Sequence, residues 1–202
     1  MIKAIIFDLW DTIGSKGFAI NKLFKEHFKI EDYPEYHKDY EEAVQITKWS
    51  SKDEMAKNFL KTFKLPINKE NIDFVVNTYK NGAKNAILFE GMDQLLAELK
   101  EKFKLGLISN TTIFEIGFID RFNIRKYFDS VVCSHDIGKI KPDREIFEEV
   151  AKQLSVNLNE CLFIDDSKKN IAKAKEYGIT TIQFKDIIQL KKELASLGII
   201  NS

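Results

Sequence analysis

The chain has 202 residues, of which 44% are hydrophobic and 31% charged, as in globular proteins with one core and room for a small insert. Its 31 basic residues balance 31 acidic ones, so it lacks the basic excess of a nucleic-acid-binding protein. No apolar run is long enough to cross a bilayer, and Cys133 and Cys161 are predicted to be buried free thiols. We therefore expect a cytoplasmic protein without nucleic-acid or membrane partners, as a monomer or a homodimer.

Short apolar runs and helical patterns alternate along most of the chain. The apolar runs predict buried parallel strands at residues 2–7, 105–109, 130–134, 161–165 and 180–184. Apolar residues at helical spacing predict helices at residues 92–103, 143–154, 167–177 and 186–197. This alternation indicates an α/β fold with a doubly wound, mostly parallel sheet of five strands.

One long segment after the first strand breaks the alternation. It contains four helical patterns, near residues 18–28, 36–49, 52–63 and 69–86, and no expected strand. Gly14 and Gly17 lie at its entrance, and Gly91 lies at its exit. We predict a helical-bundle cap at residues 15–89, inserted into an α/β core of residues 1–14 and 90–202. Such a cap can cover a site at the carboxyl edge of the sheet.

Polar residues follow four of the predicted strands, and in a parallel sheet their loops lie at the same edge. They are Asp8 and Asp11; Ser109, Asn110 and Thr111; Lys141, Pro142 and Asp143; and Asp165, Asp166 and Ser167. The site would combine a carboxylate nucleophile, a hydroxyl, a cation and an acidic pair. That set suits an anionic substrate bound together with a divalent metal.

These loops resemble the four motifs of the haloacid dehalogenase-like (HAD) hydrolase superfamily, in the subfamily with a helical cap between motifs I and II. Asp8 with Thr12 resembles motif I, and residues 107–110 resemble motif II. Residues 141–143 resemble motif III, and residues 163–167 with Asn170 resemble motif IV. The resemblance covers residues 1–14 and 90–202 in the expected order. It implies a Rossmann-like core and hydrolysis of a small phosphorylated metabolite.

The resemblance also implies a nucleophile and a metal site. Asp8 would attack phosphorus and form an aspartyl-phosphate. Mg²⁺ would be the cofactor, held by Asp8, the backbone carbonyl of Trp10 and Asp166. Asp165 would support the metal ligands or Lys141.

The remaining motif residues would bind the phosphoryl group or support those that do. Ser109 and the amide of Asn110 would hydrogen-bond the phosphoryl oxygens. Lys141 would neutralise charge on Asp8 and the phosphoryl group. Thr12 and Asn170 would lie around the metal site as supporting residues.

Trp10 departs from the phosphatase pattern, which has an aspartate two residues after the nucleophile as general acid and base. An indole N–H cannot carry a proton to and fro near neutral pH. Because general acid–base catalysis is typically worth about 10²–10⁴ in rate, we expect weak turnover of ordinary phosphate monoesters. Asp11 could relay protons only with a backbone twist, since adjacent residues of an extended segment face opposite ways. Trp10 itself is expected to pack against the cap.

Two other functions remain open at the level of sequence. An aromatic residue at this position also occurs in 2-haloacid dehalogenases, whose aspartate attacks carbon without a metal. That branch requires an arginine of the cap, however, and residues 15–89 contain none. The Asp165-Asp166 pair also resembles a metal site, which dehalogenases lack. The third possibility is a binding protein for a phosphorylated metabolite that has lost turnover.

Overall fold

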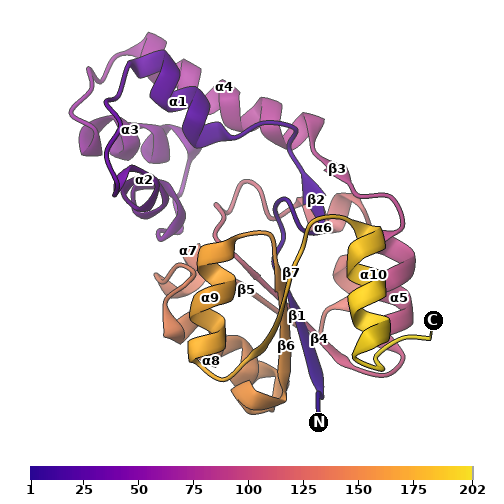
Figure 1. The fold of residues 1–202 in the computed structure, drawn as a ribbon. Coiled ribbons are helices and arrows are strands. Elements are labelled where there is room, and N and C mark those ends of the chain that lie inside the picture. The colour runs from indigo at the N-terminus through magenta and orange to yellow at the C-terminus, as the bar shows by residue number, and fades with distance from the viewer. Residues whose placement is uncertain (202) are drawn as a thin grey trace.

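A five-stranded parallel sheet forms the core of the protein, whose computed structural model describes residues 1–201. The strand order is β5-β4-β1-β6-β7, so the first strand of the chain lies in the middle of the sheet (Figure 1). This confirms the predicted doubly wound fold, and the predicted strand ends lie within two residues of the observed ones. The strands are β1 Ala4–Phe7, β4 Lys104–Ser109, β5 Ser130–Cys133, β6 Cys161–Asp165 and β7 Thr180–Gln183.

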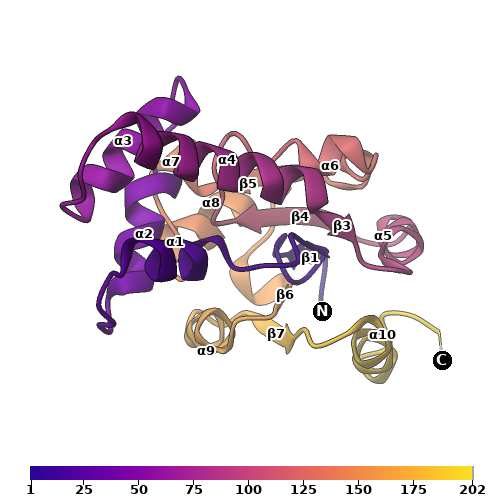
Figure 2. The same ribbon diagram turned by 90° about the horizontal axis from the view of Figure 1, so that it is seen from above.

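Four helices cover the two faces of the sheet. Helices α5 (Met92–Lys100) and α10 (Ile187–Ser196) lie on one face, and α8 (Arg144–Leu154) and α9 (Lys168–Glu176) lie on the other (Figure 2). All four residues of β1 are buried because its alternate side chains enter the two apolar cores. Gly106 allows α8 to pack closely on β4, since a Cβ there would lie 2.8 Å from Val150.

Four further helices form a bundle with an apolar core of its own, above the carboxyl edge of the sheet (Figure 1). The Ser51 hydroxyl accepts a backbone N–H at the start of the third helix of the bundle. The side-chain oxygen of Asn68 accepts one at the start of the fourth helix. Phe24 and Phe59 fill the centre, and the hydroxyls of Tyr40 and Tyr79 lie 2.8 Å apart. The helices are α1 Ile20–Phe28, α2 Tyr36–Gln45, α3 Lys52–Thr62 and α4 Lys69–Asn85.

Two short antiparallel strands, β2 (Gly14–Ser15) and β3 (Ile87–Leu88), pair where the chain leaves and re-enters the core. The expectation of no strand in this segment was therefore wrong at both of its ends. Strands of two residues are too short to show an alternating pattern. Only glycine fits at Gly14, because a Cβ would lie 2.4 Å from the carbonyl oxygen of Ile87. The exact domain boundaries, residues 1–14 and 90–202 against 15–89, stay a prediction.

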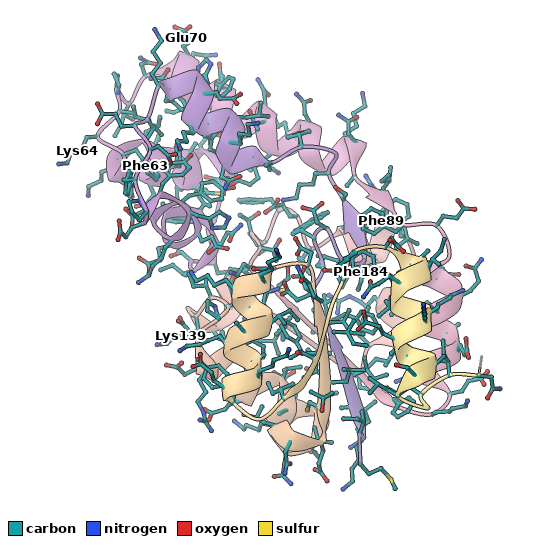
Figure 3. All side chains as sticks on the ribbon, in the orientation of Figure 1. Phe63, Lys64, Glu70, Phe89, Lys139 and Phe184 are labelled. Atoms are coloured by element: carbon teal, nitrogen blue, oxygen red, sulfur yellow. The ribbon has the colours of Figure 1, made fainter. Side chains whose placement is uncertain are left out.

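Several smaller features lie in and around the core. Phe89, just after β3, stacks on Phe184 after β7 with ring centroids 5.8 Å apart (Figure 3). Lys139 is exposed and pairs with Glu145. Short helical elements were not predicted, because a helix of fewer than two turns is too short to show an apolar pattern at helical spacing. They are α6 Phe118–Arg121, η1 Arg125–Tyr127, α7 Ser134–Ile137 and η2 Leu158–Glu160.

Two expectations about composition can be compared with the structure. Both cysteines are buried and free, as predicted. Among the helices of residues 1–201, none combines the length and apolar character needed to span a membrane.

Candidate active site

Three charged side chains meet beneath the carboxyl edge of the sheet. Asp8 directly follows β1, and its N–H donates to the carbonyl of Ile164 at 2.9 Å. The Lys141 ammonium contacts Asp8 Oδ1 and donates to Asp165 Oδ2 at 2.9 Å. All three residues are at most 5% exposed. Because a buried charge is costly without a partner, Lys141 is the group that keeps both carboxylates in place.

Asp166 adds a third carboxylate at the mouth of this cluster. One carboxylate oxygen from each of Asp8, Asp165 and Asp166 lies within 4.8 Å of the others. The Asp166 N–H donates to Thr12 Oγ1 at 3.1 Å, which fixes the start of this loop. With all groups ionised, three negative charges face the single positive charge of Lys141.

Burial, together with this excess negative charge, raises the pKa of two carboxyl groups. Burial, helped by the charges of Asp165 and Asp166, raises the pKa of Asp8 to about 7 against the opposing effect of Lys141. Burial and the charge of Asp165 raise the pKa of Asp166 to about 6. Three convergent carboxylates with a surplus of negative charge are the donor set that suits Mg²⁺. The residues present therefore fit a magnesium ion.

Asp165 is held by the start of α9. The Ser167 N–H donates to Asp165 Oδ1 at 2.7 Å, and Asn170 Nδ2 donates to Asp165 Oδ2 at 3.0 Å. Ser167 also caps the helix through its side chain. Asn170 thus lies where a supporting residue is expected.

Ser109 and Asn110 end β4 beside the cluster. Ser109 is fully buried, and within the described chain its hydroxyl has no hydrogen-bond partner. The Asn110 side chain accepts from the Lys141 N–H at 2.7 Å and donates to the Lys141 carbonyl at 3.1 Å. It also donates to Oε1 of Glu41, on α2, at 2.8 Å. Asn110 therefore links the cap to the backbone of Lys141, a role that no motif indicated.

The side chain of Trp10 is engaged on several sides. Its Nε1–H donates to Thr111 Oγ1 at 3.3 Å, and its ring packs edge-on against Phe118 with centroids 5.1 Å apart. Lys16 Nζ lies 4.3 Å from the ring centroid. Lys16 therefore contacts the ring from the predicted cap segment, and the ring packs against the apolar cluster of the core.

Asp11 adopts a left-handed backbone conformation with φ of 59°. This is the twist that the sequence argument required before Asp11 could face the site. Its carboxylate accepts from the Ser15 hydroxyl at 2.6 Å and lines the cavities described next.

Two neighbouring cavities lie between core and cap. The carboxylate cavity has a volume of about 350 Å³ and is lined by Asp8, Lys141, Asp165 and Asp166. The cap cavity, of about 290 Å³, extends beneath α2 to Phe18 and Gln45. Their shared walls are Trp10, Asp11, His37, Glu41 and Asn110. Together they offer one space for an anionic group and an adjoining one for the rest of a small molecule.

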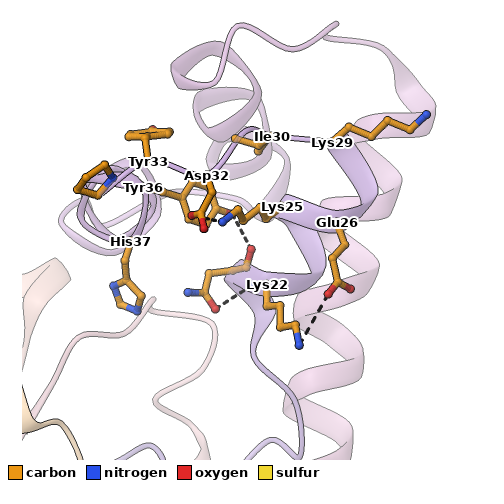
Figure 4. A pocket seen from close by; sticks show the side chains of 11 residues that line it. Lys22, Lys25, Glu26, Lys29, Ile30, Asp32, Tyr33, Tyr36 and His37 are labelled. Atoms are coloured by element: carbon orange, nitrogen blue, oxygen red, sulfur yellow. Dashed lines mark hydrogen bonds and ion pairs between the residues drawn. The ribbon is translucent and has the colours of Figure 1, made fainter.

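His37 and Glu41 on α2 had no motif to mark them. His37 Nδ1 lies 3.4 Å from Glu41 Oε2, and hydrogen bonding to Glu41 raises the pKa of His37. Figure 4 shows His37 extending from α2 toward the core, and His37 also lines a larger cavity of about 950 Å³ on the cap. That larger cavity is lined by Lys25 and Tyr36, among others, but by none of the carboxylates of Asp8, Asp165 and Asp166. The chemistry therefore belongs to the smaller cavities.

The chain is similar in sequence to proteins of known name. "Glyceraldehyde 3-phosphate phosphatase" of Methanocaldococcus jannaschii is 30% identical over 194 residues, covering 91% of this chain and 85% of that protein. "Flavin mononucleotide hydrolase 1" of Arabidopsis thaliana is 34% identical over 111 residues, covering 54% of this chain and 45% of that one. Both matched proteins are named as hydrolases of phosphorylated compounds.

The fold has a well-matched neighbour among solved structures. A HAD family enzyme from Bacteroides thetaiotaomicron, crystallised with magnesium and inorganic phosphate, superposes with a TM-score of 0.65 at 22% identity, over 94% of this chain and 99% of that one. The profile of the family "Haloacid dehalogenase-like hydrolase" matches residues 5–184. The protein belongs to the haloacid dehalogenase-like hydrolases.

Proposed function

We propose that this protein is a Mg²⁺-dependent phosphatase of small phosphorylated metabolites, with Asp8 as its nucleophile. The observation that carries the proposal is the buried Lys141 ammonium between Asp8 and Asp165, with Asp166 beside them. A metabolite phosphate would occupy the carboxylate cavity and its organic part the cap cavity. The names of the phosphatase relatives support this choice of substrate class.

The residues of the site divide the chemistry among them. A carboxylate oxygen of Asp8 attacks phosphorus while the P–O bond to the organic part breaks, which forms an aspartyl-phosphate and releases an alkoxide that takes a proton from water. Water then hydrolyses the aspartyl-phosphate to inorganic phosphate and the Asp8 carboxylate. The Lys141 ammonium neutralises charge on Asp8 and on the phosphoryl group. The Ser109 hydroxyl has no hydrogen-bond partner within residues 1–201, and it would donate to a phosphoryl oxygen together with the amide of Asn110.

Asp8, Asp166 and the backbone carbonyl of Trp10 would hold the magnesium ion, with Asp165 as support. The bound ion supplies positive charge to the phosphoryl oxygens. The contact of Glu41 with Asn110 supports a role for the cap in covering the carboxylate cavity and limiting the access of water to it.

The two alternative functions fit the residues less well. A 2-haloacid carries a carboxylate, which the surplus of negative charge at Asp8, Asp165 and Asp166 repels, and the segment 15–89 has no arginine to bind it. A binding protein without turnover would not need a buried aspartate held beside a lysine in this way. Phosphate release from a panel of metabolite phosphates, with Mg²⁺ or with EDTA, separates the three. Halide release in EDTA, or Mg²⁺-dependent binding without any phosphate release, would overturn our proposal.

The substitution Trp10→Asp is expected to raise turnover of alkyl phosphates by about 10²-fold, the lower end of the range for a general acid. It places a carboxyl where family phosphatases have their acid and base. Turnover of p-nitrophenyl phosphate should rise much less, because that leaving group needs no proton. Steady-state rates on both substrates test this, with Trp10→Phe as the control for loss of the indole. If Trp10→Asp and Trp10→Phe behave alike on alkyl phosphates, proton transfer does not limit the enzyme.

The stability of the metal-free protein is expected to fall as the pH rises from about 5 to 7.5. The folded-state pKa of Asp8 is about 7 and its ordinary value is 3.8, so the folded state binds this proton more tightly than the unfolded state. Ionisation of Asp8 across that range therefore costs stability, and Asp166, with a pKa of about 6, acts in the same direction. Thermal unfolding in EDTA should show the fall, and Mg²⁺ should reverse it at pH 7.5. An unfolding temperature in EDTA that rises over this range would contradict the proposed metal site.

A further inference from the structure

A second group of potential metal ligands lies outside the carboxylate cavity. Cys133 ends β5, and His135 and Asp136 follow in α7. One candidate ligand atom from each of the three lies within 4.8 Å of the other two. Cys133 and His135 are buried whereas Asp136 is exposed, so the cluster reaches solvent on the side of Asp136.

The imidazole of His135 is already oriented as metal-binding histidines are. Its Nδ1 lies 2.9 Å from the carbonyl oxygen of Thr111. Because a carbonyl can only accept, Nδ1 carries a proton, which in a neutral imidazole leaves the lone pair on Nε2. Histidine ligands usually donate their other ring N–H to a carbonyl or carboxylate in this manner. Nε2 lies 3.7 Å from Asp136 Oδ2, a separation that leaves space for an ion between them.

The carboxylate of Asp136 has separate partners for its two oxygens. Oδ1 accepts from Nζ of Lys48, on the cap, at 3.2 Å, and Oδ2 faces His135. A cation bound by Oδ2 would therefore leave the contact with Lys48 in place. The ion pair with Lys48 also fixes the carboxylate near the two buried ligands.

The two cysteines of the chain differ in their surroundings. Cys161 begins β6, and its thiol donates to the carbonyl of Asn157 at 3.3 Å. Within residues 1–201, Cys133 belongs to a group of three potential metal ligands and Cys161 does not. Cys161 is therefore a matched control for any effect of a buried thiol.

We propose that Cys133, His135 and Asp136 bind a divalent transition metal of the zinc class. Thiolate and imidazole favour such ions, whereas Mg²⁺ favours sites built only of oxygen ligands. On binding, the Cys133 thiol releases its proton to solvent, and the sulfur, Nε2 of His135 and Oδ2 of Asp136 become ligands. A water molecule completes the tetrahedron on the exposed side.

The position of this site ties it to the contact between core and cap. Ser134, between the two buried ligands, donates to the carbonyl of Gln45 on α2 at 2.7 Å and accepts from the Thr111 N–H at 3.0 Å. A bound metal would hold the end of β5 and the start of α7 in place, and it would take no part in catalysis at Asp8. We therefore expect Zn²⁺ to raise the unfolding temperature of the protein.

Cobalt binding tests the proposal directly, because a thiolate ligand gives Co²⁺ a charge-transfer band in the near ultraviolet. The full chain is stripped with EDTA, exchanged into excess Mg²⁺ to occupy the carboxylate cavity, and titrated with Co²⁺. Wild type and Cys161→Ser should show the band at one equivalent of Co²⁺, and added Zn²⁺ should remove it. Cys133→Ser and His135→Gln should lose the band.

Folding of the variants is followed by circular dichroism. Asp136→Asn changes an exposed side chain, so it should keep the metal-free unfolding temperature and still weaken Co²⁺ binding. Absence of the band in wild type would overturn the proposal. So would a band that survives in folded Cys133→Ser, or Co²⁺ binding of equal strength in wild type and Asp136→Asn.

Discussion

Asp8→Asn is expected to lower kcat for every phosphate ester by at least about 10⁴-fold, as removal of a covalent nucleophile does in other enzymes. An amide at this position cannot attack phosphorus, and it gives a metal ion a weaker ligand. The fold should survive, because Lys141 keeps its contact with Asp165 at 2.9 Å.

The stability of the variant gives an independent check. In EDTA at pH 7.5, Asp8→Asn should unfold at a higher temperature than wild type, because burial of an ionised carboxylate no longer opposes folding. Asp73→Asn is the control, since Asp73 is an exposed cap residue paired with Lys69. Initial rates of phosphate release and thermal unfolding measure both effects. Turnover by folded Asp8→Asn near the wild-type rate would remove Asp8 from the mechanism.

Lys141→Met is expected to abolish turnover and to destabilise the fold by about 3–5 kcal/mol, the usual cost of removing one partner from a buried ion pair. The substitution leaves Asp8 and Asp165 facing each other, at most 5% exposed, without a cation. Without the Lys141 charge, which lowers the pKa of Asp8, the Asp8 carboxyl would hold its proton more tightly, so the loss of stability should be smaller at pH 5 than at pH 7.5.

Two further variants make this test specific. Lys141→Met combined with Asp8→Asn should recover part of the lost stability, because one of the two unpaired charges is gone. Lys139→Met, at an exposed lysine two residues away, should cost less than about 1 kcal/mol. Urea unfolding of the four proteins supplies the free energies. Equal losses for Lys139→Met and Lys141→Met would show that Lys141 does not balance the buried carboxylates.

The sheet could be predicted because its strands are buried on both faces and appear as short apolar runs between helical patterns. β6, Cys161–Asp165, was predicted at both of its ends. The strands β2 and β3 were missed because two residues cannot show a pattern, and their pairing depends on the close approach of Gly14 to Ile87. Local sequence does not contain such a tertiary contact.

The meeting of Asp8, Lys141 and Asp165 also followed from the sequence, because parallel strands bring their carboxyl ends to one edge. Glu41 and His37 could not be found in this way. They lie on a cap helix without a motif, and only the way the cap lies over the core brings them to the cavity.

Two residues of the opening motif show the limits of the argument most clearly. The left-handed backbone of Asp11 depends on the turn between β1 and β2, where its N–H donates to the carbonyl of Gly14 at 2.7 Å. The position of Trp10 depends on Phe118, which is far away in the chain. Neither contact is encoded by the spacing of residues within the motif.

The central claim is that Asp8 becomes phosphorylated during turnover, and chemical trapping tests it most directly. Borohydride reduces an aspartyl-phosphate to homoserine, so a reaction quenched during turnover and reduced should carry homoserine at position 8. Peptide mass spectrometry would locate it, with Asp8→Asn and a reaction without substrate as blanks. Our account predicts homoserine at position 8 in wild type alone. Phosphate release accompanied by unmodified Asp8, or by modification of another carboxylate, would contradict it.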